Sequence, residues 1–183
     1  MPPSYVKTVK QQIFYQYAKI ISESSGFGKT NYAMITDRWK KLCSGEIHWS
    51  SNVREWLREK ENPSACIYCG EEKDLTIEHI LPRCCGGEDI TDNVVMVCKS
   101  CNSSKGGKRL YEWLGFKAKD KHHRIAEGKY LKYLYSLHEK RGTLDVSSVK
   151  ELCRACDMQK CCEKDDSIGK LSVYCIEGCF CKK

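Results

Sequence analysis

The chain has 183 residues, and its 31 Lys and Arg against 24 Asp and Glu give a formal net charge of +7. This length predicts one domain with small appendages. Hydrophobic residues make up 41% of the chain, enough for a packed core, and 30% are charged. No apolar run approaches the roughly 18 residues that a membrane span needs, which excludes a membrane protein. Because no apolar segment follows the lysines near the N-terminus, we expect no signal peptide and a cytoplasmic location.

Cysteine is the unusual residue type, with 14 copies. In a reducing cytosol, clustered cysteines indicate metal binding rather than disulfides. The alternative, a secreted disulfide scaffold, is disfavoured by the missing signal segment. Three Cys-x-x-Cys pairs are present: Cys66 with Cys69, Cys98 with Cys101, and Cys153 with Cys156.

The first part of the chain, residues 1–62, is predicted to be a helical arm. Apolar residues at intervals of three and four predict a helix over residues 6–21, which the Ser-Ser-Gly-Phe-Gly segment at 24–28 ends. Further helices are expected over 32–42 and 51–60. No chemical motif lies here, so dimerisation, DNA contact and core support all remain open as roles.

Three further segments are predicted after the helical arm. They are a core at 63–116, a basic helical segment at 117–146 and a Cys-rich segment at 147–183. β-Branched and apolar residues predict strands over 75–81 and 94–97, separated by a turn-rich loop. After Cys101 a helix is expected to end near Leu114. A longer helix is expected over 121–141, and Ser147 is expected to cap a short helix that reaches Cys153.

The first two cysteine pairs bracket the predicted hairpin. Zinc prefers four thiolate or imidazole ligands in a tetrahedron, and two Cys-x-x-Cys turns supply four thiolates. The sequence therefore predicts a structural zinc site that closes the base of the hairpin, formed by Cys66, Cys69, Cys98 and Cys101.

Glu78 and His79 stand next to each other at the end of the first predicted strand. Adjacent strand residues point to opposite faces, yet a turn at the strand end can bring both toward one pocket. A neutral imidazole can take a proton from water, and a carboxylate can hold a hard divalent cation such as Mg²⁺. Taken alone, His79 would more often be a hydrogen-bonded structural histidine.

The residues that follow Glu78 and His79 in the chain favour a catalytic role for His79 over a structural one. Glu78-His79-Ile-Leu-Pro-Arg is followed by Gly86-Gly87-Glu, by Asp92-Asn93-Val-Val-Met-Val-Cys and by Cys101-Asn102-Ser-Ser-Lys105-Gly. This order resembles the HNH, or ββα-metal, family of nucleases, in the variant with flanking Cys-x-x-Cys pairs. The resemblance covers roughly residues 66–113. It places the three motif residues after which the family is named at His79, Asn93 and Asn102.

The resemblance implies a phosphodiesterase that uses one catalytic metal. His79 would be the general base, Glu78 and Asn102 would bind Mg²⁺ or Mn²⁺, and Asn93 would brace the hairpin loop and orient His79. The family more often has Asp where this chain has Glu78, so the position of the metal at Glu78 is less determined. No Gly-x-Ser-x-Gly, His-Glu-x-x-His or complete P-loop motif competes with this assignment.

A basic stretch follows the motif. Residues 99–124 contain eight Lys or Arg and two acidic residues, Glu112 and Asp120, which gives 8 − 2 = +6. Beside a phosphodiesterase motif, this charge favours contact with a nucleic-acid backbone. The candidate contacts are Arg83, Lys105, Lys108 and Arg109.

The last segment holds seven of the cysteines. A turn at 165–169 and a returning strand at 171–175 would bring Cys161 or Cys162 opposite Cys175. With Cys153 and Cys156, Cys162 and Cys175 would form a second zinc site. Which of Cys161 and Cys162 is a ligand stays open, Cys179 and Cys181 are alternative ligands, and a redox-active thiol cluster is the alternative to zinc.

These patterns together predict an α+β protein, with a small ββα-metal core closed by a four-cysteine zinc site, flanking helices and a C-terminal zinc knuckle. We expect a divalent-metal-dependent DNA endonuclease that binds two structural zinc ions and cuts double-stranded DNA, with a role in restriction or defence because little else is attached. A homing or mobile-element nuclease and a non-catalytic zinc-finger nucleic-acid-binding module are the alternatives. Double-strand cutting with one site per chain suggests a homodimer.

Overall fold

The computed structural model describes residues 2–49, 64–118 and 124–180, with the side chains of 116–118 excepted. It divides the chain into two compact units, which differs from the four consecutive segments expected from the sequence. The first unit combines Met1–Trp49 with Leu134–Cys179, and the second combines Ser50–Tyr133 with Phe180–Lys183. The N-terminal and C-terminal helices therefore belong to one unit. No helix in the described residues is both long and apolar enough to cross a membrane.

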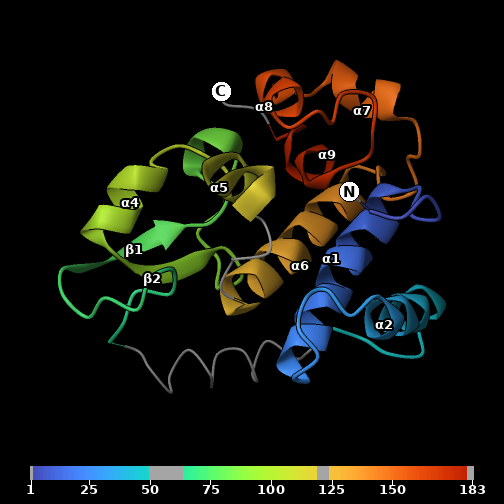
Figure 1. Cartoon of the computed structure of the whole chain (residues 1–183). Coiled ribbons are helices and arrows are strands. Elements are labelled where there is room, and N and C mark those ends of the chain that lie inside the picture. The colour runs from blue at the N-terminus through green and yellow to red at the C-terminus, as the bar shows by residue number, and fades with distance from the viewer. Residues whose placement is uncertain (1, 50–63, 119–123, 181–183) are drawn as a thin grey trace. The chain divides into compact units, whose positions relative to one another are not determined.

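The elements confirm an α+β fold (Figure 1). In chain order they are α1 (Val9–Ser24), α2 (Tyr32–Ser44), β1 (Leu75–His79), the 3-10 turn η1 (Arg83–Cys85), β2 (Val94–Cys98), α4 (Lys99–Lys105), α5 (Leu110–Ala118), α6 (Arg124–Lys140), α7 (Val149–Arg154), α8 (Gln159–Lys164) and α9 (Val173–Glu177). The helix expected over residues 51–60 lies outside the described residues.

Helix α1 forms the centre of the first unit. Thr8 and Gln11 close a capping box at its start. The indole Nε1 of Trp39, on α2, donates a 3.1 Å hydrogen bond to the Gln11 carbonyl, and Phe14 stacks on Tyr135 of α6 with ring centroids 5.6 Å apart. Because α1 is buried nearly all around, it is a core helix, which agrees with core support among the roles left open for this segment.

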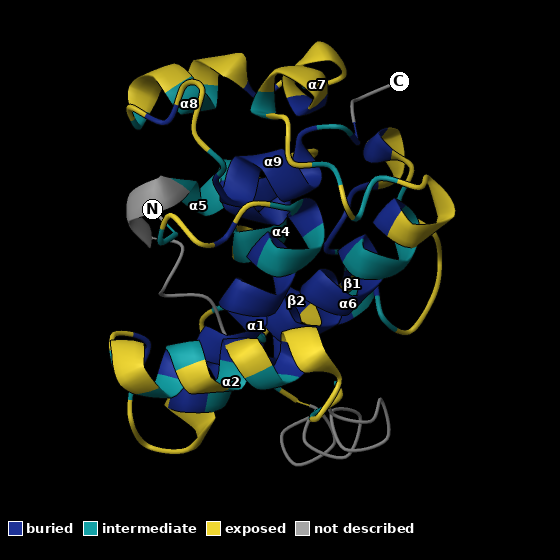
Figure 2. Ribbon diagram, turned by 90° about the vertical axis from the view of Figure 1, so that its right-hand side faces the viewer, coloured by how far each residue is buried: buried dark blue, intermediate teal, exposed yellow. Residues whose placement is uncertain are grey.

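The C-terminal part of the first unit corrects one prediction. Residues 171–175 were expected to form a strand, but Ser172, whose hydroxyl accepts from the Tyr174 N–H, caps helix α9. All five residues of α9 are buried, and Figure 2 shows this helix in dark blue beneath the exposed α7 and α8. A run of consecutive apolar residues does not distinguish a buried strand from a buried helix, which explains the error. Helix α7 begins after Ser148, one residue later than expected.

The second unit is built on an antiparallel pair, β1 and β2, with Glu78 opposite Val95 and His79 opposite Val94. Because side chains alternate, Glu78 lies on the buried face with Val95, and His79 lies on the face of the exposed Ile77 and Met96. The single helix expected after Cys101 is instead two, α4 and α5, because Gly106 ends α4 with a positive φ of 52°. Figure 1 shows α4 beside the two strands.

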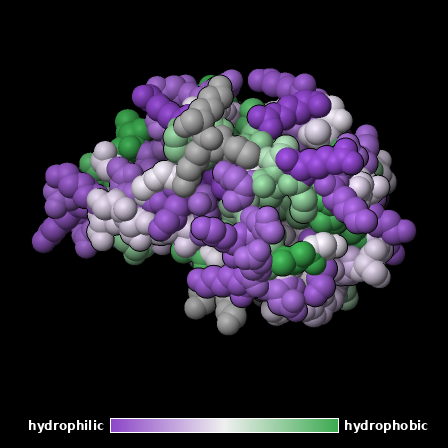
Figure 3. Space-filling model, turned by 90° about the horizontal axis from the view of Figure 1, so that it is seen from above, coloured by the Kyte–Doolittle hydropathy of each residue, from purple (hydrophilic) through white to green (hydrophobic). Residues whose placement is uncertain are grey.

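The face drawn in Figure 3 is mainly hydrophilic, and its hydrophobic side chains form separate small areas. Scattered apolar side chains of this kind are ordinary on a water-exposed surface.

Candidate functional site

Four cysteines of the second unit converge on one point. The ligand atoms of Cys66, Cys69, Cys98 and Cys101 all lie within 4.8 Å of one another. The chain forms the first turn through the Gly70 N–H, which donates to the Cys66 carbonyl at 2.8 Å, and the Ile67 N–H ties this turn to Met96 of β2 at 3.0 Å. Four thiols at this spacing fit a tetrahedral ion such as zinc.

The surroundings of these thiols shift their pKa values in different directions, and the pKa of Cys69, like that of Cys101, is raised. Although burial opposes the shift, hydrogen bonds with the backbone of Cys98, Cys69 and Tyr68 lower the pKa of Cys66 to about 7. Burial raises the pKa of Cys101, and the Cys101 N–H donates to the Cys98 sulfur at 3.4 Å. The thiolate is the form that binds metal, so Cys66 is prepared for coordination near neutral pH.

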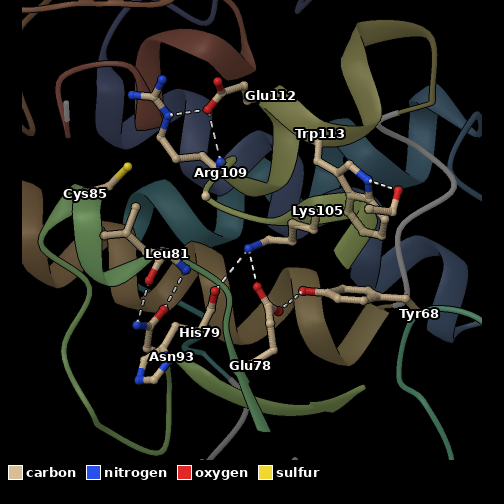
Figure 4. Close-up of polar contacts among 12 residues, drawn as sticks. Tyr68, Glu78, His79, Leu81, Cys85, Asn93, Lys105, Arg109, Glu112 and Trp113 are labelled. Atoms are coloured by element: carbon tan, nitrogen blue, oxygen red, sulfur yellow. Dashed lines mark hydrogen bonds and ion pairs between the residues drawn. The ribbon is translucent and has the colours of Figure 1, made fainter. Parts of the chain in front are cut away.

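Asn93 braces the loop between the strands (Figure 4). Its Oδ1 accepts from the Leu81 N–H at 2.7 Å, and its Nδ2 donates to the carbonyls of Leu81 and Glu88, each at 3.0 Å. Gly87 completes this packing, because a Cβ there would lie 1.9 Å from the Leu81 carbonyl oxygen. The fully buried Asn93 therefore fixes the loop that follows His79.

His79 is the last residue of β1. Its Nε2 lies 2.8 Å from Oδ1 of Asp89 and 3.4 Å from Nε of Arg83. Nη2 of Arg83 donates to the other oxygen of Asp89 at 2.7 Å. The hydrogen bond from His79 and the charge of Arg83 lower the pKa of Asp89, so this carboxylate is ionised and can only accept. Because the contact of Nε2 with Asp89 is shorter than its contact with Arg83, we assign the Nε2 proton to a hydrogen bond with Asp89. The other ring nitrogen, Nδ1, then carries no proton and can accept one.

Glu78 meets a different set of partners. Lys105 forms an ion pair with Oε1 of Glu78 and also donates to the His79 carbonyl at 3.0 Å, while the Tyr68 hydroxyl donates to Oε2 of Glu78 at 3.0 Å. Burial and the negative charge of Glu78 raise the pKa of Tyr68 well above its usual value. In Figure 4 the Lys105 and Tyr68 side chains approach this carboxylate from two directions. The carboxylate is therefore buried and neutralised within the protein.

Glu78 and His79 thus share no side-chain partner. We expected the turn after β1 to bring both side chains toward one pocket, but strand alternation directs Glu78 inward and His79 to the exposed face. Only the backbone of His79, through its carbonyl, joins the Lys105 cluster.

The remaining predicted contacts differ in exposure. Asn102 is half-buried on α4, and its side-chain amide makes no hydrogen bond among the described residues. Arg83 and Lys108 are exposed, whereas Lys105 is fully buried and Arg109 is 1% exposed and paired with Glu112. The expectation that Lys105 and Arg109 reach a nucleic-acid backbone does not fit this burial, because each cation already neutralises a carboxylate inside the unit.

The second predicted ligand set belongs to the first unit. Cys153 lies near the end of α7, Cys156 follows that helix, and Cys162 and Cys175 lie on α8 and α9. In the described part of the chain, Cys66, Cys69, Cys98 and Cys101 alone form a group of potential ligands as close as 4.8 Å.

Comparison with known proteins agrees with this geometry. Residues 66–111 match the model of the HNH endonuclease family. This segment of the chain is therefore similar to the HNH endonuclease family, and the cysteine cluster brackets it. No curated protein and no solved structure matches the chain.

Two partners in the site were not expected from the sequence. Asp89 is one of several acidic residues in a polar loop, and only the fold shows that it reaches His79. Tyr68, between the two cysteines of the first pair, has the position of a spacer residue, although it contacts Glu78 across the unit.

Proposed function

We propose that this protein is a divalent-metal-dependent endonuclease that hydrolyses phosphodiester bonds of double-stranded DNA. The observation that carries the proposal is the HNH match over residues 66–111, with a His79 imidazole held by Asp89 at the end of a braced loop. The family supports a nucleic-acid substrate in general, and the choice of DNA rests on the sequence resemblance.

His79 is the proposed general base. With the Nε2 proton engaged by Asp89, Nδ1 accepts a proton from the attacking water. The carboxylate of Asp89 stabilises the imidazolium that forms and keeps the ring in one orientation, as a carboxylate does in other acid-base pairs. Arg83 holds Asp89 in turn, and its exposed guanidinium is available to a phosphate oxygen.

Glu78 and Asn102 are the proposed ligands of the catalytic cation. Carboxylate and amide oxygens are donors that Mg²⁺ and Mn²⁺ accept, and the Asn102 amide is not engaged by the described residues. Such a cation would neutralise charge that develops on the scissile phosphate. The ammonium of Lys105 now balances Glu78, so Lys105 has to move away from Oε1 for Glu78 to become a ligand.

The same ion pair favours a second candidate function. With both of its oxygens held by Lys105 and Tyr68, Glu78 serves as an internal structural group. In that case the hairpin would be a non-catalytic zinc-finger module that binds nucleic acid. A restriction or defence role, a homing or mobile-element role and a homodimer remain predictions from the sequence.

A plasmid cleavage assay with Mg²⁺ or Mn²⁺ separates the two candidates. We expect cleavage by the wild type and a loss of about 10²- to 10⁴-fold for His79→Ala, since this is the usual contribution of a general base. His48→Ala is the matched control, because His48 lies outside the HNH segment and in the other unit. DNA binding without cleavage by the wild type and by His79→Ala would favour the binding module.

A further inference from the structure

Four cysteines outside the HNH segment lie on or directly after the last three helices of the first unit. Cys153 and Cys156 form the third Cys-x-x-Cys pair, at the end of α7 and just after it. Cys162 lies on α8 and Cys175 on α9. These four residues are called the C-terminal thiol cluster below.

Backbone contacts hold the Cys-x-x-Cys turn against α9. The N–H of Asp157 donates to the Gly178 carbonyl at 3.3 Å. A Cβ at Gly178 would lie 2.4 Å from the sulfur of Cys156, so this sulfur packs directly on the backbone that follows α9. The turn and the end of α9 are therefore in contact at Cys156.

A second set of contacts brings α8 to the same place. The Ser167 N–H donates to the Cys162 carbonyl at 2.8 Å, and the Ser167 hydroxyl donates to the same oxygen at 3.4 Å. Tyr174 of α9 donates its hydroxyl to Asp165, which closes the connection between α8 and α9. The loop is thus folded so that α8, with Cys162, is tied to the helix that carries Cys175.

Backbone N–H groups point at two of the sulfurs. The Met158 N–H donates to the Cys156 sulfur and the Ser172 N–H donates to the Cys175 sulfur, both at 3.4 Å. The Cys101 N–H makes the same kind of bond to Cys98 in the first cluster. Such bonds stabilise thiolate over thiol and orient the sulfur, as contacts around metal ligands do.

We propose that Cys153, Cys156, Cys162 and Cys175 bind a second structural zinc ion. The site lies outside residues 66–111, so it does not depend on the nuclease proposal. Among the described residues only the first cluster already forms a compact group of ligand atoms, so the second site is completed when the ion binds.

A zinc ion also accounts for the stability of this region. Helices α7, α8 and α9 have only six, six and five residues, and helices this short are not stable by themselves. Helices α7 and α8 are largely exposed, and α8 has no buried residue to hold it (Figure 2). Four metal–thiolate bonds would supply the missing tertiary connection.

The test is the zinc content of the full chain, measured by native mass spectrometry and elemental analysis. We expect two zinc ions per chain in the wild type and one in Cys156→Ser and Cys162→Ser. Cys43→Ser is the matched control and keeps two, because Cys43 is an exposed cysteine of the same unit that lies on α2. One zinc ion in the wild type, or two in both ligand variants, would overturn the proposal.

Alkylation of the wild type avoids any loss of folding in the variants. Cys153 and Cys43 are both exposed, so a thiol reagent can reach each of them when no metal is bound. We expect the labelling rate of Cys153 to rise at least about tenfold when a strong zinc chelator is added, while that of Cys43 stays the same. An unchanged labelling rate of Cys153, or a disulfide between members of the cluster, would contradict a zinc site.

Discussion

Individual side chains of the HNH segment have separable tasks although several are neighbours in the chain. His79 lies on the exposed face of the hairpin and bonds to Asp89, whereas Glu78 lies on the buried face and bonds to Lys105 and Tyr68. Asn93 forms its side-chain hydrogen bonds with the backbone of Leu81 and Glu88 and so fixes the loop. Proton transfer, charge balance and loop geometry can therefore be tested one residue at a time.

Asp89→Asn tests the proposed positioning of His79. The amide cannot stabilise an imidazolium, so we expect kcat for DNA cleavage to fall about tenfold or more while KM and zinc content stay unchanged. Asp89→Glu should restore part of the rate because it returns the carboxylate. Asp74→Asn is the control, since Asp74 is an exposed acid that pairs with Lys99. A fall in DNA binding without a fall in kcat would assign Asp89 a different role.

Lys105→Met tests whether Glu78 can accept a divalent cation. Without the ammonium, the buried carboxylate lacks its main counter-charge, so the metal-free protein should lose about 3–5 kcal/mol in the free energy of unfolding. If Glu78 is a metal ligand, Mn²⁺ should raise the melting temperature of this variant more than that of the wild type. Identical shifts in Lys105→Met and in Lys105→Met combined with Glu78→Gln would show that Glu78 does not bind the metal.

At the scale of the elements, short segments depend on contacts with longer ones. The α9 helix has five residues, and its Ile176 carbonyl accepts a 2.9 Å hydrogen bond from Nε2 of His138 on α6. Nδ1 of the same ring lies 2.8 Å from the Thr143 hydroxyl, and the ring is fully buried. His138 is thus an internal link between two helices.

The free energy of unfolding should depend on pH through His138. Burial, aided by the charge of Arg141, lowers the pKa of His138 below its ordinary value of about 6.5. Between the ordinary pKa of histidine and the lowered pKa of folded His138, the unfolded chain binds a proton that the folded protein does not. The free energy of unfolding therefore falls as the pH decreases through this range, and His138 does not change it at higher pH. His138→Gln should show a smaller loss between about pH 7.5 and 5.5 in urea unfolding. An equal loss in both proteins would assign the acid sensitivity to other groups.

At the scale of the molecule, the two units have different sources of stability. The first contains α1, a long and almost fully buried helix, whereas the second is built on a two-stranded sheet. A two-stranded sheet is marginal in water without further support. The cluster of Cys66, Cys69, Cys98 and Cys101 closes the base of that sheet and is the support that we expect to matter most.

Removal of metal should therefore unfold the second unit. Structural zinc contributes on the order of 10 kcal/mol to the folding of small modules, which exceeds what a two-stranded sheet supplies. We expect a strong chelator to abolish amide-exchange protection in β1 and β2 while α1 stays protected. Cys66→Ser should behave like the chelated wild type, and Cys84→Ser, which alters an exposed cysteine outside the cluster, should not. Unchanged protection of β1 and β2 would contradict a structural metal.

Much of the fold was predictable because its signals are local. The apolar stripe indicated α1, the β-branched run indicated β2, and the paired cysteines located the cluster that brackets the HNH segment. Residues 171–175 were predicted wrongly because a short apolar run has no period long enough to separate strand from helix. The partners Asp89 and Tyr68 could not be predicted, because loop residues are placed by contacts distant in sequence.

The sequence by itself determined the chemistry that this chain can offer, namely four paired thiols, an imidazole and a carboxylate in the order of an HNH segment. The order and spacing of residue types carry that information directly. Only the tertiary structure decided that Glu78 turns inward to Lys105 while His79 turns outward to Asp89. That outcome depends on which face of the hairpin is covered, and packing between distant segments determines the covered face.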